Sequence, residues 1–297
     1  MHACFITDNP ETRTHPVIGF VLQQLSGSHC VRVLDVRGLT MARALACEER
    51  HSLADIYLLK SHAIQALELA RVLERRGALV VNSWFSSMSC QDRVLMADRM
   101  SDACIAWPRT RLLIPSEDLR THRGVLSDLS FPLMIKSRYS CRDDLVARLN
   151  SVDELLATVR QRNKDSFILQ EFVDGDGWDV KVWIIGEDVF AARRRPALET
   201  IPCETVPLSA DEIPREWVSM AQKIGRVFGL SLYGVDLVIG AQGPVAIDVN
   251  AFPGFRGVGG AGTALVALIE HLGSKPRSMN NPVLPQQDET RASSSAR

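Results

Sequence analysis

Apolar and polar positions divide the first part of the chain into short strands and amphipathic helices. The expected strands are Ala3–Asp8, Cys30–Val36, Ala54–Leu59 and Ala78–Ser83, and the expected helices are Pro16–Leu25 and His62–Arg75. Continuous apolar strands that alternate with helices are typical of a parallel sheet covered on both faces. We therefore predict an α/β domain over residues 1–90.

The rest of the chain has the patterns of longer helices and of antiparallel hairpins. Two S-x-x-E capping boxes, at Ser151 and at Ser209, are each expected to open a helix. The expected helices are 91–106, 151–162, 209–228 and 263–272, and the expected strands are 131–136, 166–173, 178–185, 189–195, 233–240 and 244–250. Residues 274–297 are polar and contain proline, so we expect a disordered tail there.

Composition excludes several classes of protein. The 297 residues carry a net charge of −1, and no basic run is joined to aromatic residues, which argues against a polynucleotide substrate. Seven cysteines without C-x-x-C spacing indicate reduced thiols. The chain has neither G-x-G-x-x-G nor G-x-x-x-x-G-K-[ST], which excludes NAD enzymes and P-loop NTPases. Without a signal peptide or an apolar run of bilayer length, we expect a cytoplasmic protein with no membrane partner.

Three oxygen-bearing side chains are expected to gather on the second hairpin. Asp248 and Asn250 lie two residues apart on one strand, so their side chains point to the same face. The short loop at residues 241–243 sets Asp236 roughly opposite Asp248. Clustered carboxylates repel each other unless a cation lies between them, and hard oxygen ligands suit Mg²⁺, with Mn²⁺ as an alternative. Each residue alone is better explained as a solvated strand end or a turn residue, and only the three together, with cations elsewhere in the chain, favour the metal.

Several cations could meet the anion that such a metal site serves. Lys136 ends the apolar strand FPLMIK, and Lys181 lies inside WDVKVWII. A lysine at the end of an apolar strand is well placed if it contacts phosphate, although a solvated edge lysine is an equal alternative. In the run 193–195, alternation puts Arg193 and Arg195 on one side of the strand and Arg194 on the other.

Taken in order, the motifs resemble the ATP-grasp superfamily, and within it the ligases related to the ribosomal protein S6 glutamate ligase. The motifs that carry the resemblance are FPLMIK (131–136), LQEFV (169–173), WDVKV (178–182) with Gly186 and Arg195, GVD (234–236) and DVNAFPG (248–254). The similarity spans about residues 91–272.

The resemblance implies an ATP-grasp fold, in which two α+β subdomains hold ATP between them after a small parallel-sheet pre-ATP-grasp domain. It implies units at 1–90, 91–166 and 167–273, and roles for individual residues. Arg93 and Lys136 would contact ATP phosphates, Gln170, Glu171, Phe172 and Val173 would form the adenine hinge, and Asp179 would bind the ribose. Lys181 and Arg195 would face the transferred phosphate, and Asp236, Asp248 and Asn250 would hold Mg²⁺.

The sequence also departs from the family pattern in three places. Where relatives have a glycine-rich loop after the lysine, this chain has SRYSCRDDLVARL, in which Arg138 and Arg142 are candidate replacements for the backbone donors. Arg93 stands where the family often has lysine. The segment 196–213 lacks the asparagine and glycine pair of relatives. The resemblance therefore does not fix the acceptor substrate, which can differ from that of the glutamate ligases.

The function that the resemblance implies is formation of an amide or peptide bond. ATP would phosphorylate a carboxylate, an amine would attack the acyl phosphate, and ADP and phosphate would leave. The substrates would be small molecules or peptides, and homo-oligomerisation stays open. An ATP-grasp small-molecule kinase of the inositol phosphate type is the first alternative, and a nucleotide-binding protein without catalysis is the second.

Overall fold

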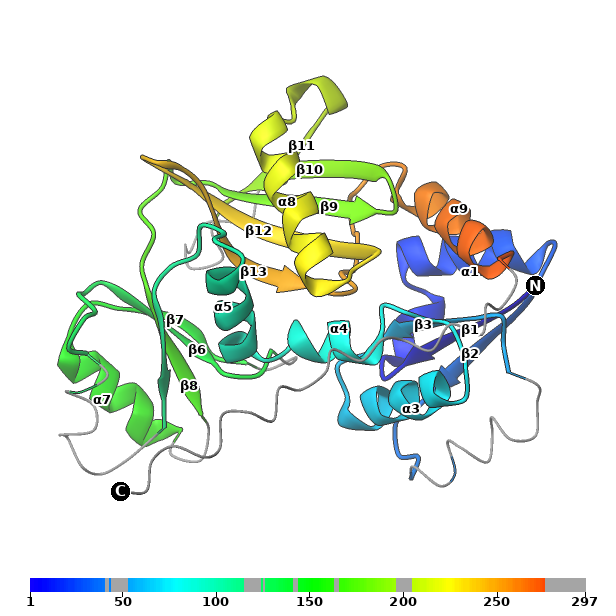
Figure 1. The fold of residues 1–297 in the computed structure, drawn as a ribbon, viewed down its shortest axis with the longest axis horizontal. Helices are drawn as coiled ribbons and strands as arrows, with labels where there is room; N and C mark the ends of the chain where they lie inside the picture. The colour runs from blue at the N-terminus through cyan, green and yellow to red at the C-terminus, as the bar shows by residue number, and fades with distance from the viewer. Residues whose placement is uncertain are drawn as a thin grey trace, which may run out of the picture.

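Three β-sheets make up the framework of the protein. The computed structural model describes residues 1–40, 43, 53–114, 124, 126–140, 144–162, 166–195 and 205–275. The sheets follow one another along the chain, and helices pack against each of them (Figure 1). The predicted tail beyond residue 275, and the Arg142 of the loop after Lys136, lie outside the described residues. In the described part, no helix is both long and apolar enough to span a membrane.

The first sheet is parallel, as predicted, with strand order β2-β1-β3-β4. Its strands are β1 (His2–Thr7), β2 (Cys30–Asp35), β3 (Ile56–Lys60) and β4 (Val80–Val81). Helix α3 (Ile64–Arg75) covers one face, and α1 (Pro16–Ser26), which follows the short 3-10 helix η1 (Pro10–Arg13), covers the other. The carboxyl ends of β1 and β3 lie side by side, because Thr7 pairs with Lys60.

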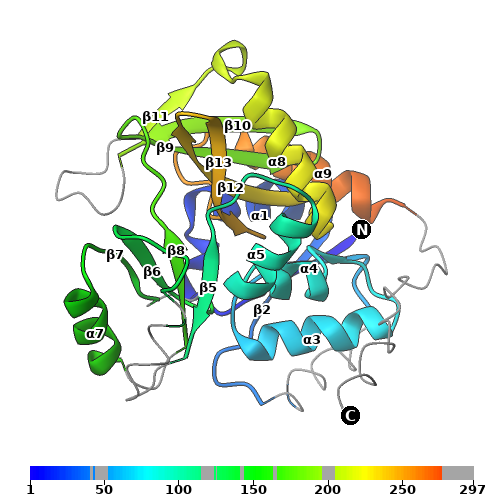
Figure 2. The ribbon, with the colours of Figure 1, turned by 60° about the vertical axis from the view of Figure 1, so that its left-hand side comes forward.

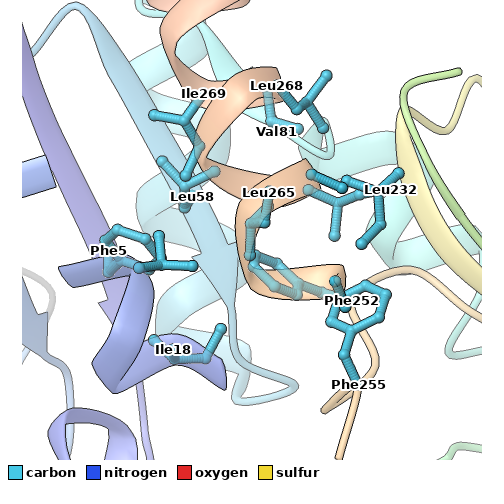
Figure 3. Packing of buried hydrophobic residues seen from close by; sticks show 14 of the residues in the cluster. Phe5, Ile18, Leu58, Val81, Leu232, Phe252, Phe255, Leu265, Leu268 and Ile269 are labelled. Atoms are coloured by element: carbon cyan, nitrogen blue, oxygen red, sulfur yellow. The ribbon is translucent and has the colours of Figure 1, made fainter. Parts of the chain in front are cut away.

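The last helix, α9 (Ala261–Gly273), returns to the first sheet. It packs against α1, and both contribute to one hydrophobic core with residues of the first and third sheets. Figure 3 shows Leu265 and Ile269 of α9 between Phe5 and Leu58 on one side and Leu232 on the other. This shared core fixes the first sheet against the third.

The second sheet is antiparallel and has the order β5-β8-β6-β7. Helices α4 (Trp84–Ser89) and α5 (Arg93–Asp102) lead into it, and α7 (Val152–Gln161) covers it. Its strands are β5 (Thr110–Leu113), β6 (Leu133–Ser137), β7 (Val146–Leu149) and β8 (Phe167–Glu171). Because β8 pairs with β5 and β6, this sheet extends past the unit boundary predicted at residue 166. The division into units stays a prediction.

The third sheet is antiparallel with the order β11-β10-β9-β12-β13. Its strands are β9 (Asp179–Ile185), β10 (Asp188–Arg194), β11 (Thr205–Leu208), β12 (Leu232–Gly240) and β13 (Gly243–Asn250). Helix α8 (Arg215–Phe228) packs on one face through Trp217, Ala221, Ile224 and Phe228. Figure 2 shows the second and third sheets in different layers, with α5 beside the β12–β13 hairpin.

Two local predictions about helices need correction. The Ser209 box is present, but it caps the 3-10 turn η2 (Ala210–Glu212), and α8 begins only after Pro214, whose backbone is extended at the N-cap position. The helix predicted over residues 91–106 is shorter, because Asp92 caps α5 through the backbone N–H of Val94. Strands β5, β7 and β11 and helix α4 had no predicted counterpart.

Candidate functional site

One face of the third sheet carries a row of charged side chains across four neighbouring strands, β10, β9, β12 and β13. Lys181 on β9 pairs in register with Asp236 on β12, and Asp236 pairs with Asp248 on β13. Asp179 lies two residues before Lys181 and is opposite Arg194 of β10. Side chains two residues apart share a face, so these five residues lie on the side of the sheet away from α8. The predicted apposition of Asp236 and Asp248 is confirmed.

Asp236 is held by two cations. Lys181 Nζ lies 2.9 Å from Asp236 Oδ1, and Arg194 Nη2 lies 3.4 Å from Asp236 Oδ2. Burial acts to raise the pKa of Asp236, but Lys181 and Arg194 outweigh it and leave the pKa below its usual value. The pKa of the neighbouring Asp179 is raised by burial, with Arg194 opposing the shift. Asp236 is thus a carboxylate that stays ionised in a partly buried place.

A β-bulge puts Asp248 opposite Asp236. Starting from the turn, Gly240 pairs with Gly243, and the pairing continues in that register as far as Leu237 with Ala246. The register then shifts by one residue, so that Ile247 has no partner and Asp236 pairs with Asp248. Lys136, at the end of β6, donates from Nζ to the Ile247 carbonyl oxygen at 3.0 Å. Burial lowers the pKa of Lys136, Arg93 adds to that shift, and Asp248 opposes it. A buried lysine from the second sheet therefore reaches β13 of the third, the strand that carries Asp248 and Asn250.

Arg93 makes a second link between the two sheets. It begins α5 and is only 3% exposed. Its guanidinium donates to the Ser137 carbonyl oxygen at 2.8 Å and pairs with Asp144 at 2.8 Å. Its Nη2 atom also lies 3.7 Å from Asp248 Oδ2. Arg93 and Lys136, both predicted to meet phosphate, thus lie beside the acidic row.

Buried polar atoms without a hydrogen bond concentrate at this site. Within the described part of the chain, two buried guanidinium atoms of the site, Arg93 Nε and Arg194 Nε, lack a hydrogen-bond partner, whereas Asp236 Oδ1 has Lys181 Nζ at 2.9 Å. Unsatisfied buried groups are costly and call for an explanation such as a bound ion or ligand. Two cationic donors without a partner fit an anionic ligand.

The acidic residues fit Mg²⁺ by their chemistry. Asp236 and Asp248 provide two carboxylates, and Asn250 adds a carboxamide oxygen that already accepts from the Phe252 backbone N–H at 3.0 Å. No cluster of three His, Cys, Asp or Glu residues suited to a metal occurs among the residues that the structure describes. Mg²⁺ does not need such a cage, since it takes one or two carboxylates and completes its shell with waters and phosphates.

Gly234 explains how the chain after Asn250 fits beside the row. Gly234 pairs with Asn250, and a Cβ atom there would lie 3.3 Å from both the Lys181 stem and the ring of Pro253. The absence of a side chain therefore leaves room for Lys181 and for the turn after β13.

The predicted adenine hinge crosses from the second sheet to the third. Gln170 is buried and donates from Nε2 to Thr110 Oγ1 at 3.1 Å. Glu171 accepts from the backbone N–H of Arg109 at 3.2 Å, and Phe172 lies under the Arg148 guanidinium, 4.3 Å from its ring centroid. Val173 follows on the way to Asp179. Their role toward a nucleotide stays a prediction.

The arginine run is arranged differently from the roles that the resemblance implied. Arg194 contacts Asp236, whereas Arg195 stacks on Trp178 at 4.2 Å and Arg193 lies over Trp217 at 5.8 Å. Arg194 was therefore missed as a site residue. The sequence showed that Arg193 and Arg194 point to opposite faces of the strand. It did not show which of these faces carries Asp236. Arg138 is paired with Asp92 at 2.7 Å.

A cavity of about 270 Å³ opens beside Asn250 and was not predicted as a site. Its lining includes Asp8, Thr12, His15, Lys60 and His62 from the first sheet and its connections, and Ser140 from the loop after β6. Burial lowers the pKa of Lys60 to about 8, against the opposing charge of Asp8. Burial also lowers the pKa of His15 and of His62. The sequence held a signal, since Lys60 ends an apolar parallel strand and ligands bind at that edge.

Comparisons with known proteins agree with this architecture. A family model described as the RimK-like ATP-grasp domain matches residues 90–269. A protein of Xanthomonas oryzae pv. oryzae (strain MAFF 311018) named "Probable alpha-L-glutamate ligase" is 35% identical over 117 residues. That match covers 36% of this chain and 39% of the relative, which is less than half of the relative's length.

Two solved structures share the fold over almost the whole chain. The RimK domain protein ATP-grasp from Sphaerobacter thermophilus has a TM-score of 0.71 and 18% identity, covering 92% of this chain and 99% of that one. The D-alanine–D-alanine ligase from Bacillus anthracis complexed with ATP has a TM-score of 0.73 and 17% identity, covering 92% and 97%. At these identities the likeness establishes the fold alone.

Proposed function

Because the chain belongs to the RimK-like ATP-grasp domain family, we propose that it is an ATP-dependent carboxylate–amine ligase. The observation that carries the proposal is the acidic pair Asp236 and Asp248, set among cations of which Arg93 and Arg194 each have a buried Nε atom without a hydrogen-bond partner. That arrangement matches a nucleotide triphosphate with its metal better than it matches a solvated strand end. The Xanthomonas relative and the Bacillus structure are both named as ligases, which supports ligation as the reaction class.

The reaction has two steps. A substrate carboxylate oxygen attacks the γ-phosphorus of ATP, the bond from that phosphorus to the β,γ-bridging oxygen breaks, and ADP leaves with the electron pair. The nitrogen of an amine then attacks the acyl phosphate carbon, phosphate leaves with the former carboxylate oxygen, and the amine loses a proton. When bound, Mg²⁺ neutralises phosphate charge in the first step.

Residues of this chain would position the reactants and offset the charge that develops on them. Lys136 and Arg93 extend from the second sheet toward Asp248 and would contact the phosphates. Lys181 and Arg194 would turn from Asp236 to the transferred phosphate, while Asp236, Asp248 and Asn250 take the metal. The family resemblance implies that Arg195 also contacts the transferred phosphate. To do so, its guanidinium would first have to move off the ring of Trp178, on which it stacks. Preorganised cations of this kind supply most of the catalysis in phosphoryl transfer.

The cavity beside Asn250 is the proposed place of the substrate that is not ATP. Within the described residues no carboxylate lies at ion-pair distance from Lys60, which donates from Nζ only to the Phe252 carbonyl oxygen at 2.5 Å. A lysine ammonium with N–H donors still free suits a carboxylate of a small acid or peptide. The few cations that line the cavity do not suit a substrate with several phosphates, which disfavours the alternative of an inositol phosphate kinase.

The test is an incubation of purified protein with ATP, Mg²⁺ and pools of amino acids, small acids and inositol phosphates. The proposal expects ADP and free phosphate in a one-to-one ratio, released only when an amine and an acid are both present. It also expects a product with the mass of the two substrates minus one water. A product heavier by one phosphoryl group would establish the kinase instead, and tight ATP binding with no turnover would establish the binder.

A further inference from the structure

Asn82 links the first sheet to the strands of the acidic row. It follows β4 and is 2% exposed. Its Nδ2 donates to the Leu232 carbonyl oxygen at 2.6 Å and to the Ala251 carbonyl oxygen. Its Oδ1 accepts from the backbone N–H groups of Ser231 at 2.8 Å and Leu232 at 3.3 Å. One carboxamide thus uses both donors and both acceptor positions on the hairpin backbone.

These contacts lie at the open end of the β12–β13 hairpin. Leu232 begins β12, and Ala251 directly follows Asn250 at the end of β13. The turn at the other end pairs residues up to Leu237 and Ala246, but the pairs beyond Ile247 follow a register shifted by one residue. The turn therefore does not determine the pairing that brings Asp248 opposite Asp236.

The alternative register would be harmful to the site. Without the bulge, the turn would pair Ile247 with Asp236 and Asp248 with Val235. Val235 is buried in the core under α8, so that pairing would turn the Asp248 carboxylate toward apolar side chains. Something beyond the turn has to hold the shifted register, and the Lys136 contact acts only at Ile247 itself.

We propose that Asn82 is a positioning residue that fixes the shifted register of the β12–β13 hairpin and so sets the geometry of Asp236, Asp248 and Asn250. The proposal deepens the proposed function, because the metal site it supports belongs to that function. Asn82 contacts no reacting group. It acts by joining the two strands where their own ladder ends.

The first experiment compares Asn82→Ala and Asn82→Asp with the unchanged protein. Asn82→Asp keeps the shape but cannot donate to the two carbonyl groups. The matched control is Ser86→Ala, because Ser86 is also buried and joins α4 to the end of α8 through the Gly229 carbonyl oxygen at 3.1 Å. Hydrogen exchange is followed in peptides covering 231–237 and 248–252. Mn²⁺ binding is titrated by electron paramagnetic resonance with a non-hydrolysable ATP analogue.

Both Asn82 variants should exchange faster in those two peptides and bind Mn²⁺ about tenfold more weakly or worse, the loss typical of residues that orient metal ligands. Ser86→Ala should leave both measurements near those of the unchanged protein. Affinity within about twofold of the unchanged protein, or a loss matched by Ser86→Ala, overturns the proposal. If the unchanged protein bound no Mn²⁺, the proposed function would fail, and the exchange comparison alone would decide the role of Asn82.

A second comparison tests the register directly. Deleting Ile247 removes the extra residue, so the turn itself would pair Asp248 with Asp236 while Ala246 and Val249 keep their buried positions. In that background Asn82→Ala should weaken Mn²⁺ binding less than about twofold, against about tenfold without the deletion. An equal loss in both backgrounds would show that Asn82 does not set the register.

Discussion

At the scale of single residues, the two facing carboxylates are held in different ways. Asp236 lies between Lys181 and Arg194, whereas the side chain of Asp248 is 30% exposed and its nearest cation, Arg93, is 3.7 Å away. Asp236 therefore contributes to the packing of the sheet as well as to the site. Asp248 contributes little to the packing of the sheet, so a substitution there tests the site with less effect on the fold.

We predict that Asp248→Asn lowers kcat at least about a hundredfold, because it removes a charge that a bound metal needs. Unfolding by urea should keep its midpoint, since among the described residues this partly exposed side chain has only the 3.7 Å ion pair with Arg93. Asp188→Asn, a change of the same kind at the exposed start of β10, is the control and should leave both values unchanged. Near-normal turnover of Asp248→Asn would end the metal assignment.

The lowered pKa of Lys60 predicts how the KM for the acid substrate depends on pH. Its pKa is lowered from 10.5 to about 8 by burial, so its positive charge is present below pH 8 and lost above it. If Lys60 binds a substrate carboxylate, the KM for the acid should rise as the pH passes 8. Lys60→Met should have a high KM at every pH. Lys223→Met, which removes another lysine that donates to a backbone carbonyl group, should keep the profile of the unchanged protein.

The same shift has a consequence for stability. In the unfolded chain Lys60 keeps its proton up to pH 10.5, so between pH 8 and 10.5 the unfolded state binds more protons than the folded one. The contribution of Lys60 to the free energy of unfolding should therefore increase with pH over that range. Urea titrations of the unchanged protein and of Lys60→Met should diverge there, and parallel curves would contradict the lowered pKa.

At the scale of elements, the sequence predicted what depends on neighbours along the chain. The alternation in 233–240 and 244–250 predicted a hairpin with its acids on one face, and the structure confirms both. The bulge at Ile247 escaped prediction because contacts with Lys136 and Asn82, more than a hundred residues away, hold it. Strand β7 was missed for a similar reason, since its exposed edge position removes the apolar signal.

The start of α5 provides a prediction at this scale. Asp92 caps the helix through Val94 and also accepts three hydrogen bonds from the Arg138 guanidinium. Asp92→Asn keeps an acceptor for the cap but loses the ion pair, whereas Asp92→Ala loses both. We expect free energies of unfolding lower by about 1 and about 3 kcal/mol. Equal losses in urea titrations would mean that the cap contributes nothing.

At the scale of the whole molecule, the site is assembled from three sheets. Arg93 and Lys136 come from the second unit, the acidic row from the third, and Lys60 with the cavity from the first. The sequence could indicate most of these residues through their motifs. It could not indicate that Arg194 rather than Arg195 meets Asp236, or that Asn82 reaches the hairpin, because only the packing of separate units decides those contacts.

The central claim is that a carboxylate is activated by phosphorylation, and the path of one oxygen atom tests it. The acid identified in the pooled assay is labelled with ¹⁸O in its carboxylate and incubated with ATP, Mg²⁺ and its amine. The released phosphate is then analysed by mass spectrometry. The account predicts one labelled oxygen in each phosphate formed together with amide. Phosphate without label, in step with product formation, would contradict an acyl phosphate and with it the proposed function.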